Sequence, residues 1–393
     1  MIKKTSIYTP KFILICICSL LFSSSFNMLL PELPEYLSSL GGDEYKGLII
    51  ALFTLTAGIS RPFSGKLTDT IGRKPVMIFG SLVCVICGLL YPLLSTVIGF
   101  LFLRFFHGFS TGFTPTAISA YVADIIPQKR WGEAIGVQGL FFSTGFALGP
   151  VIGSFIKLHY SFDVLFYSSF VMSLLSVVAF LTIKESLQNK QTFSFQILKI
   201  SKNEIIAKEV LPAAILTFVY YIPFGALLTI IPDWSSHLGI VNKGSFFIYF
   251  TVSSLVIRFI SGKASDVYGR PIVMKIGMFL LIVSLLYLGY FVSEDQLYIG
   301  ACFYGSAMGI LSPTINAWNI DLSIKEFRGK AIATRFIALE AGIGLGALSS
   351  GWYFKESITK VPSIFYFSSF IIFLGMIYLL VYFRKTKKLL AKK

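Results

Sequence analysis

Two stretches of the chain, RPFSGKLTDTIGRKPV at residues 61–76 and RFISGKASDVYGRPIV at residues 258–273, decide the fold. They lie 197 residues apart, and eight of their sixteen positions are identical. The same offset aligns further glycines and aspartates: Gly108/Gly305, Gly112/Gly309, Asp124/Asp321, Gly132/Gly329, Gly145/Gly342 and Gly149/Gly346. Chance similarity between apolar segments does not produce such identities, so the chain contains two copies of one ancestral unit.

Composition places both copies in a membrane. Of 393 residues, 55% are hydrophobic and only 13% are charged, and the apolar residues recur in runs of about twenty, which match the roughly 30 Å hydrocarbon core of a bilayer. We therefore expect an all-α membrane protein of twelve transmembrane helices. The predicted spans are 11–31, 47–67, 75–94, 96–121, 134–157, 161–183, 209–233, 244–264, 272–292, 297–320, 330–354 and 362–383.

Six spans fall in each copy, so both copies enter the membrane in the same orientation, as parallel repeats. We predict a first half at residues 1–183, a polar connector rich in lysine at residues 184–208, and a second half at residues 209–393.

The net charge of +15 follows the predicted topology. Terminal segments and even-numbered loops hold 25 of the 34 Lys and Arg residues, and odd-numbered loops hold five. This bias predicts that both termini are cytoplasmic in the plasma (inner) membrane, and it favours contact with anionic lipid. Because topology accounts for the charge, nucleic-acid binding has no support.

The segment GKLTDTIGRK at residues 65–74 resembles the G-x-L-a-D-r-x-G-r-[KR] loop between helices two and three of the major facilitator superfamily. GKASDVYGRP at residues 262–271 is a second copy, in which proline replaces the final basic residue. The resemblance covers essentially the whole chain and implies two six-helix bundles around a central cavity.

In the resembled family this loop helps to hold the cytoplasmic gate closed. Physically, an Asp there can accept from backbone amides at a nearby helix N-terminus and pair with an Arg. The alternative is that the charges only mark topology. The implied gating residues are Gly65, Asp69, Gly72, Arg73, Gly262, Asp266, Gly269 and Arg270.

RFFHGFSTG at residues 104–112 resembles the family stretch R-x-x-q-G-x-g, with His107 where Gln is usual, which leaves its proton role open. Arg104 is expected about 14 Å into its helix, near the bilayer midplane, where function is the default reading. Arg61, Arg258 and Arg335 lie closer to the cytoplasmic ends, where snorkelling suffices.

Glu340 is the acid predicted nearest the midplane, and it is our first candidate for proton or cation coupling. The alternative is a fixed ion pair with Arg335, at a spacing that suits an in-helix pair poorly. Three further acids, Glu32, Glu35 and Asp233, are expected at outer helix ends as a solvated rim, with an entrance role as the lesser alternative.

GFALGPVIG at residues 145–153 resembles the G-x-x-x-G-P-x-x-G-G stretch that accompanies antiport in this superfamily, with Ser154 for the last glycine. Gly145, Gly149 and Gly153 would let helices approach closely, and Pro150 would bend the helix. The alternative is ordinary small-residue packing. Pocket-wall candidates are Asn27, Tyr220 and Tyr221.

We therefore predict a secondary transporter resembling the twelve-helix drug:proton antiporters, which exports a small amphipathic or drug-like molecule. The alternative is a proton symporter that imports a sugar, nucleoside or organic anion. ATP use is not expected, because no G-x-x-x-x-G-K-[ST] sequence occurs.

An enzyme or receptor is a poorer match, because the three histidines are scattered over different elements and the gate loops are duplicated. We expect no cofactor and no metal, and one chain should function as a monomer. The five cysteines all fall in predicted spans and are interpreted as small buried hydrophobic residues.

Overall fold

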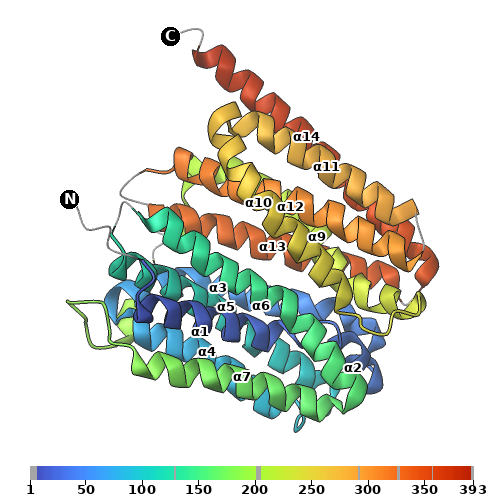
Figure 1. The fold of residues 1–393 in the computed structure, drawn as a ribbon, viewed down its shortest axis with the longest axis horizontal. Coiled ribbons are helices and arrows are strands. Elements are labelled where there is room, and N and C mark those ends of the chain that lie inside the picture. Colours follow the sequence, from blue (N-terminus) through green and yellow to red (C-terminus); the bar gives the residue numbers. More distant parts are fainter. Residues whose placement is uncertain are drawn as a thin grey trace. The chain divides into compact units, whose positions relative to one another are not determined.

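The computed structural model describes residues 7–127, 130–200, 205–290, 293–324, 328–355 and 357–390, and gives only the backbone at 132, 262, 263, 328 and 386–390. Throughout these residues the regular structure is helical (Figure 1). The long helices of the described chain are α1 (Pro10–Asn27), α3 (Lys46–Thr70), α4 (Arg73–Leu90), α5 (Val97–Ile125), α6 (Trp131–His159), α7 (Phe162–Thr182), α9 (Leu211–His237), α10 (Ser245–Tyr268), α11 (Arg270–Tyr290), α12 (Glu294–Leu322), α13 (Arg328–Phe354) and α14 (Val361–Leu390).

These helices confirm the predicted all-α membrane class. Ten of them are long and apolar enough to cross a bilayer, and α10 contains a shorter apolar stretch, Ser245–Ser261. A short helix, α2 (Leu33–Ser39), follows α1. Several helix ends lie a few residues outside the predicted spans, because a helix continues past the apolar stretch by which a span is recognised.

Helix starts are set by residues that the sequence places just before the apolar runs. Thr9, Thr96 and Ser161 each accept a hydrogen bond from a backbone amide in the first turn of α1, α5 and α7. Ser293 forms a full capping box with Gln296 at the start of α12. These side chains satisfy amides that would otherwise have no partner, so they fix where the helices begin.

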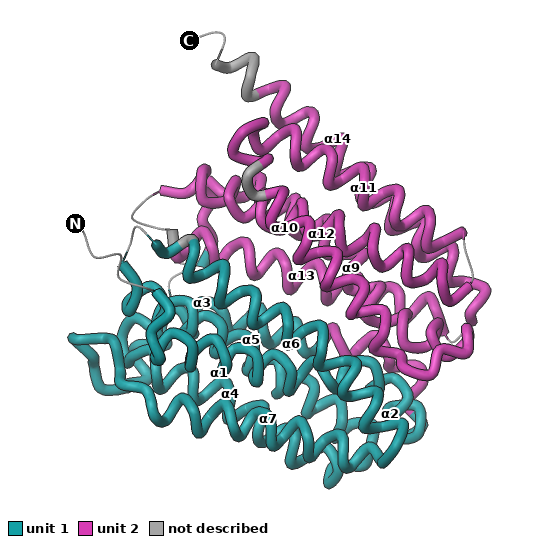
Figure 2. The backbone as a smooth tube through the Cα atoms, viewed as in Figure 1, with its two compact units in different colours: residues 1–41, 52–205 teal, residues 42–51, 206–393 magenta. Residues whose placement is uncertain are grey.

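The chain divides into two compact units, residues 1–41 with 52–205 and residues 42–51 with 206–393 (Figure 2). In unit 1, α1 packs on α6 and α7, and α4 packs on α5 and α7. In unit 2, α9 packs in the same way on α13 and α14, and α11 packs on α12 and α14. The repeat in the sequence is thus a repeat of helix packing within each unit.

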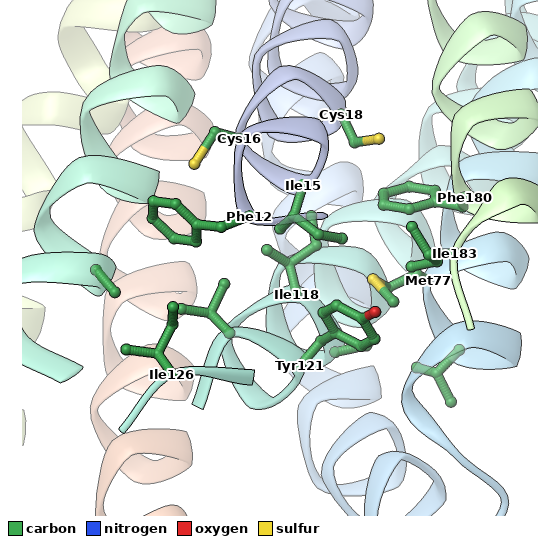
Figure 3. Close-up of a cluster of buried hydrophobic side chains, with 14 of the residues drawn as sticks. Phe12, Ile15, Cys16, Cys18, Met77, Ile118, Tyr121, Ile126, Phe180 and Ile183 are labelled. Carbon is green, nitrogen blue, oxygen red and sulfur yellow. The ribbon is translucent and has the colours of Figure 1, made fainter. Parts of the chain in front are cut away.

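The core of unit 1 is a cluster of buried apolar side chains to which α1, α3, α4, α5, α6 and α7 all contribute (Figure 3). Phe12 and Ile15 of α1 meet Ile118 of α5 and Phe180 of α7. Cys16 and Cys18 are buried in the same cluster, and they behave there as small hydrophobic residues.

Helices α1 and α6 touch through their backbones. A Cβ atom added at Gly145 would lie 2.6 Å from the carbonyl oxygen of Leu20, and one at Gly153 would lie 1.8 Å from that of Met28. Gly149 lies between these two contacts along α6, and a Cβ atom added there would lie 3.0 Å from the carbonyl oxygen of Ser24. No residue with a side chain fits at these positions without moving the helices apart.

This contact predicts that Gly153→Ala lowers the thermal unfolding midpoint of the detergent-purified protein. The added methyl group must displace α1, and overpacking of this kind costs about 1–3 kcal/mol. Gly139→Ala is the matched control, because it lies on α6 with nothing within 4 Å of its Cβ position. Equal midpoints for the two variants would contradict the contact between α1 and α6.

Candidate functional site

The first copy of the duplicated motif forms a cluster of charged residues, Asp69, Arg73 and Asp124, which we call the first ionic cluster. The Arg73 guanidinium lies 2.9 Å from Asp124 of α5 through Nε and 3.2 Å from Asp69 of α3. It also donates to the carbonyl oxygen of Thr68, and the Ser186 hydroxyl donates to Asp124. One arginine thus ties the end of α3 and the end of α5 to the start of α4.

The second copy forms the same arrangement from Asp266, Arg270 and Asp321, the second ionic cluster. The Nε atom of Arg270 lies 3.1 Å from Asp321, its NH1 group pairs with Asp266, and NH1 also donates to the hydroxyl of Ser265. Asp124 and Asp321 were missed as site residues, although the 197-residue offset already paired them. That pairing was the signal that could have identified them.

The predicted gate loops are tight turns. Gly65 and Asp69 lie within α3, which ends at Thr70, and α4 begins at Arg73 after Gly72, with φ of 124°. In unit 2, Gly269 alone separates α10 from α11, with φ of 84°. Such values favour glycine. Gly262 falls in α10 at a position where only the backbone is described.

Glu185 caps the start of α4, which corrects the expectation that Asp69 would meet a helix N-terminus. Its carboxylate accepts from the backbone amides of Arg73 at 3.0 Å and Lys74 at 2.9 Å, and also from those of Ser186 and Leu187. Burial alone would raise the pKa of Glu185, but the four amides together lower it below its ordinary value. The sequence pattern of the motif gave no signal for this residue.

A buried polar chain in unit 1 surrounds Arg104. Arg104 donates to the Tyr91 hydroxyl at 3.4 Å, and its guanidinium lies 4.6 Å from the ring centroid of Phe53. The Tyr91 hydroxyl lies 3.1 Å from Nδ1 of His107, whose Nε2 lies 3.2 Å from the Cys84 sulfur. The predicted pair Arg104 and His107 is therefore brought together through Tyr91, which sequence reasoning missed.

Unit 2 has an aromatic cluster where unit 1 has this polar chain. The Tyr220 and Tyr221 rings lie 4.4 Å apart on α9, and Phe224 and Phe250 connect them to Tyr304 of α12. Tyr304 occupies the repeat position of His107, and Phe250 that of Phe53. The structure thus places Tyr220 and Tyr221 together.

Three further residues singled out in the sequence are also buried. Glu340 of α13 is 7% exposed. Asn27 ends α1, where its amide group donates to the carbonyl oxygen of Ser23 at 2.7 Å and lies against Gly149. Arg61 is buried and donates to the Thr116 hydroxyl of α5, so the expected snorkelling to the surface is wrong for this residue.

Of the three outer acids expected in a solvated rim, Glu32 is buried, which corrects the expectation for this residue, whereas the side chains of Glu35 and Asp233 are 41% and 23% exposed. Glu32 is 2% exposed and accepts a hydrogen bond from Ser154 of α6. Glu35 pairs with Lys157, and Asp233 lies 3.4 Å from Lys46 within unit 2. Each carboxylate meets a polar partner on another helix, which the linear pattern of helix ends does not reveal.

Two repeated six-helix units with matching ionic clusters define a secondary transporter built from two parallel repeats. The sequence profile of the Major Facilitator Superfamily matches residues 15–240 and 213–393, and the chain belongs to that family.

Two multidrug resistance proteins are similar in sequence over most of the chain. "Multidrug resistance protein 2" of Bacillus subtilis (strain 168) is 28% identical over 80% of this chain and 82% of its own. The "Multi-drug resistance efflux pump PmrA homolog" of Lactococcus lactis subsp. lactis (strain IL1403) is 26% identical over 83% of each chain. Both are multidrug resistance proteins by name.

Solved structures share the fold. The human organic anion transporter MFSD10 (TETRAN) superposes with a TM-score of 0.75 at 18% identity, covering 94% of this chain and 100% of that one. A D-xylose-proton symporter gives a TM-score of 0.75 at 17% identity over 94% and 95% of the chains. At such identities the likeness shows the fold alone.

Acid should weaken the cap at α4. The lowered pKa means that ionised Glu185 stabilises the fold at neutral pH, and that this contribution disappears as pH falls through the lowered pKa. Glu185→Gln should therefore lower the free energy of unfolding at pH 7 by about 1 kcal/mol, the size expected for a partly solvated carboxylate, and the thermal unfolding midpoint should fall with it. The difference from the unsubstituted protein should shrink at pH values below 4.5, the ordinary value for this group.

Glu133→Gln is the control for this pH series, because Glu133 is an exposed acid paired with Arg130 on its own helix. It should change the midpoint little at any pH. A pH-independent difference between Glu185→Gln and the unsubstituted protein would contradict the capping role.

The two ionic clusters should differ in strength. The side chain of Asp124 is 30% exposed and that of Asp321 is 52% exposed, so water screens the second pair more. Asp124→Asn should cost about 1–3 kcal/mol of stability and Asp321→Asn less than about 1 kcal/mol. Double-mutant cycles with Arg73→Gln and Arg270→Gln measure both couplings, and a larger coupling for Asp321 would refute the ranking.

Proposed function

We propose that the protein is a proton-coupled exporter, which exchanges protons for a small amphipathic or drug-like molecule by alternating access. It works as a single chain in the plasma membrane, with both termini in the cytoplasm, and uses neither ATP nor a cofactor. The multidrug resistance names of its relatives support the substrate class.

The face of α6 that packs against α1 is the observation that supports export. Its three glycines meet the α1 backbone, and Pro150 removes one helix hydrogen bond beside them. Ala347 and Ser350 occupy the repeat positions of Pro150 and Gly153 in α13. Gly342 and Gly346 of α13 meet the α9 backbone in the same way as Gly145 and Gly149 meet α1, so Pro150 is what distinguishes the first half. We assign the bend at Pro150 the role of a pivot.

Proton coupling is assigned to buried ionisable groups. An ionisable residue inside a membrane span is expensive to keep and marks a functional site by default. Glu340 of α13 can gain and lose a proton, and in unit 1 Arg104 and His107 of α5 form a buried polar chain with Tyr91. The aromatic cluster of Tyr220 and Tyr221 offers flat apolar surface for the exported molecule.

A proton symporter that imports a sugar or nucleoside is the second candidate. The fold of this chain is shared by a D-xylose-proton symporter and, with a TM-score of 0.78 at 14% identity, by the nucleoside transporter NupG, and one such scaffold serves both directions. The ionic clusters and the buried acid suit either direction.

Proton flux in proteoliposomes decides between them. A panel of amphipathic cations, sugars and organic anions is added, and internal pH is recorded for the unsubstituted protein and for Glu340→Gln. We expect an amphipathic cation to drive opposed proton movement, and we expect Glu340→Gln to reduce that movement by at least about tenfold, because a transport proton relay fails without its acid.

Glu133→Gln is again the matched control, since it removes an exposed acid from a helix end and should leave the flux unchanged. Proton movement in the same direction as the substrate would establish import. Unchanged coupling of proton and substrate movement in Glu340→Gln would show that Glu340 is not the coupling residue.

A further inference from the structure

Unit 1 contains a cavity whose lining includes none of the residues of the buried polar chain around Arg104. It is a cavity of about 330 Å³ beside the turn between α3 and α4, within the size range of small-molecule sites. Every side chain that lines it is apolar: Leu67, Ile71, Pro75, Val76, Phe79, Phe113, Phe193 and Leu198. Leu67, Val76 and Phe113 also belong to the buried apolar cluster of unit 1, and Ile71 and Leu198 pack against it, so the cavity lies at the edge of that core.

The outer wall of this cavity comes from the segment that follows α7. Phe193 and Leu198 belong to it, and hydrogen bonds fasten it beside the cavity. The Gln191 amide donates to the carbonyl oxygen of Thr70 at 2.8 Å, and the Lys66 ammonium donates to that of Lys199 at 2.6 Å. The segment therefore crosses the α3–α4 turn as a strap.

The strap is basic and aromatic. Residues 184–208 contain five lysines and two glutamates, and Lys190 and Lys199 are exposed on either side of Phe193. The Phe193 ring is in edge contact with Phe195, with centroids 5.6 Å apart, and Phe195 is 81% exposed. Lysine beside exposed aromatic rings is typical of a segment that lies in a membrane interface.

We propose that the cavity binds one acyl chain of an anionic phospholipid, with the phosphate held by Lys190 and Lys199. The apolar lining fits a hydrocarbon chain and offers no partner to a polar ligand. The charge of the strap complements an anionic headgroup, and the charge distribution of the chain predicts that this end faces the cytoplasmic leaflet, where anionic lipids lie.

The site goes beyond the proposed transport function and does not depend on it. The cavity is lined on both sides of the turn that carries Asp69 and Arg73. A chain bound there adds contacts to α3, α4 and the strap at once, so it stabilises the first ionic cluster in the arrangement described.

Two matched tryptophan variants test the assignment. Phe193→Trp places a reporter in the cavity wall, and Phe195→Trp places one two residues away, outside it. Each is reconstituted in phosphatidylcholine nanodiscs that contain increasing fractions of phosphatidylglycerol brominated on its acyl chains, or of phosphatidylcholine brominated in the same way. The signal of the unsubstituted protein, which has four tryptophans, is subtracted.

We expect the Phe193→Trp signal to reach half-quenching at a brominated phosphatidylglycerol fraction at least about fivefold lower than for brominated phosphatidylcholine, since each lysine attracts anionic lipid. The Phe195→Trp signal should show a smaller difference. Adding Lys190→Gln and Lys199→Gln, both at exposed positions, should abolish the preference in Phe193→Trp without unfolding the protein.

Three results would overturn the proposal. Equal quenching at the two positions would mean that the cavity holds no chain. Equal quenching of Phe193→Trp by the two lipids would show that the cavity does not select a lipid with an anionic headgroup. Relief of quenching by an exported amphipathic cation, with the lysine substitutions without effect, would assign the cavity to that molecule.

Discussion

Backbone-to-backbone contact between helices is the constraint on which both units depend. Lipid gives apolar helices little reason to associate, so the attraction has to come from close packing and polar contacts. A Cβ atom at Gly108 would lie 2.0 Å from the carbonyl oxygen of Phe53, and the repeat position Gly305 meets Phe250 at the same distance. The two units therefore use glycine at the same places to bring the same helices together, and the ionic clusters form where these helices end.

Differences between the halves are informative because the scaffold is shared. Arg104 is replaced by Ala301 and Glu340 by Ser143 at the corresponding repeat positions. Arg104 and Glu340 are thus buried charges without a charged counterpart in the other half, while the arginine–aspartate contacts at the helix ends occur in both. Both copies keep the contacts that hold the helix ends together, whereas the positions of Arg104 and Glu340 have diverged.

The sequence predicted the fold class well because the relevant signals are local. Apolar runs of span length and the 197-residue repeat each require only a linear reading. The failures all involve partners far apart in the chain. Glu185 reaches α4 from beyond α7, Glu32 is buried against Ser154, and Tyr91 joins Arg104 to His107. No periodicity encodes which helix a side chain meets, so such contacts appear only when the helices are packed.

Burial separates two kinds of charge in this protein. The acids of the ionic clusters are partly exposed, with side-chain exposures from 30% to 73%, and contacts of that kind are weak enough to break and re-form. Arg104 is fully buried and Glu340 nearly so, and a buried charge is too costly to retain for topology alone. This difference supports assigning reversible gating to the helix ends, because the contacts of a gate must break at a low cost in free energy. It also supports assigning proton or substrate handling to the helix interiors, because a coupling site needs a charge whose free energy changes strongly with its surroundings.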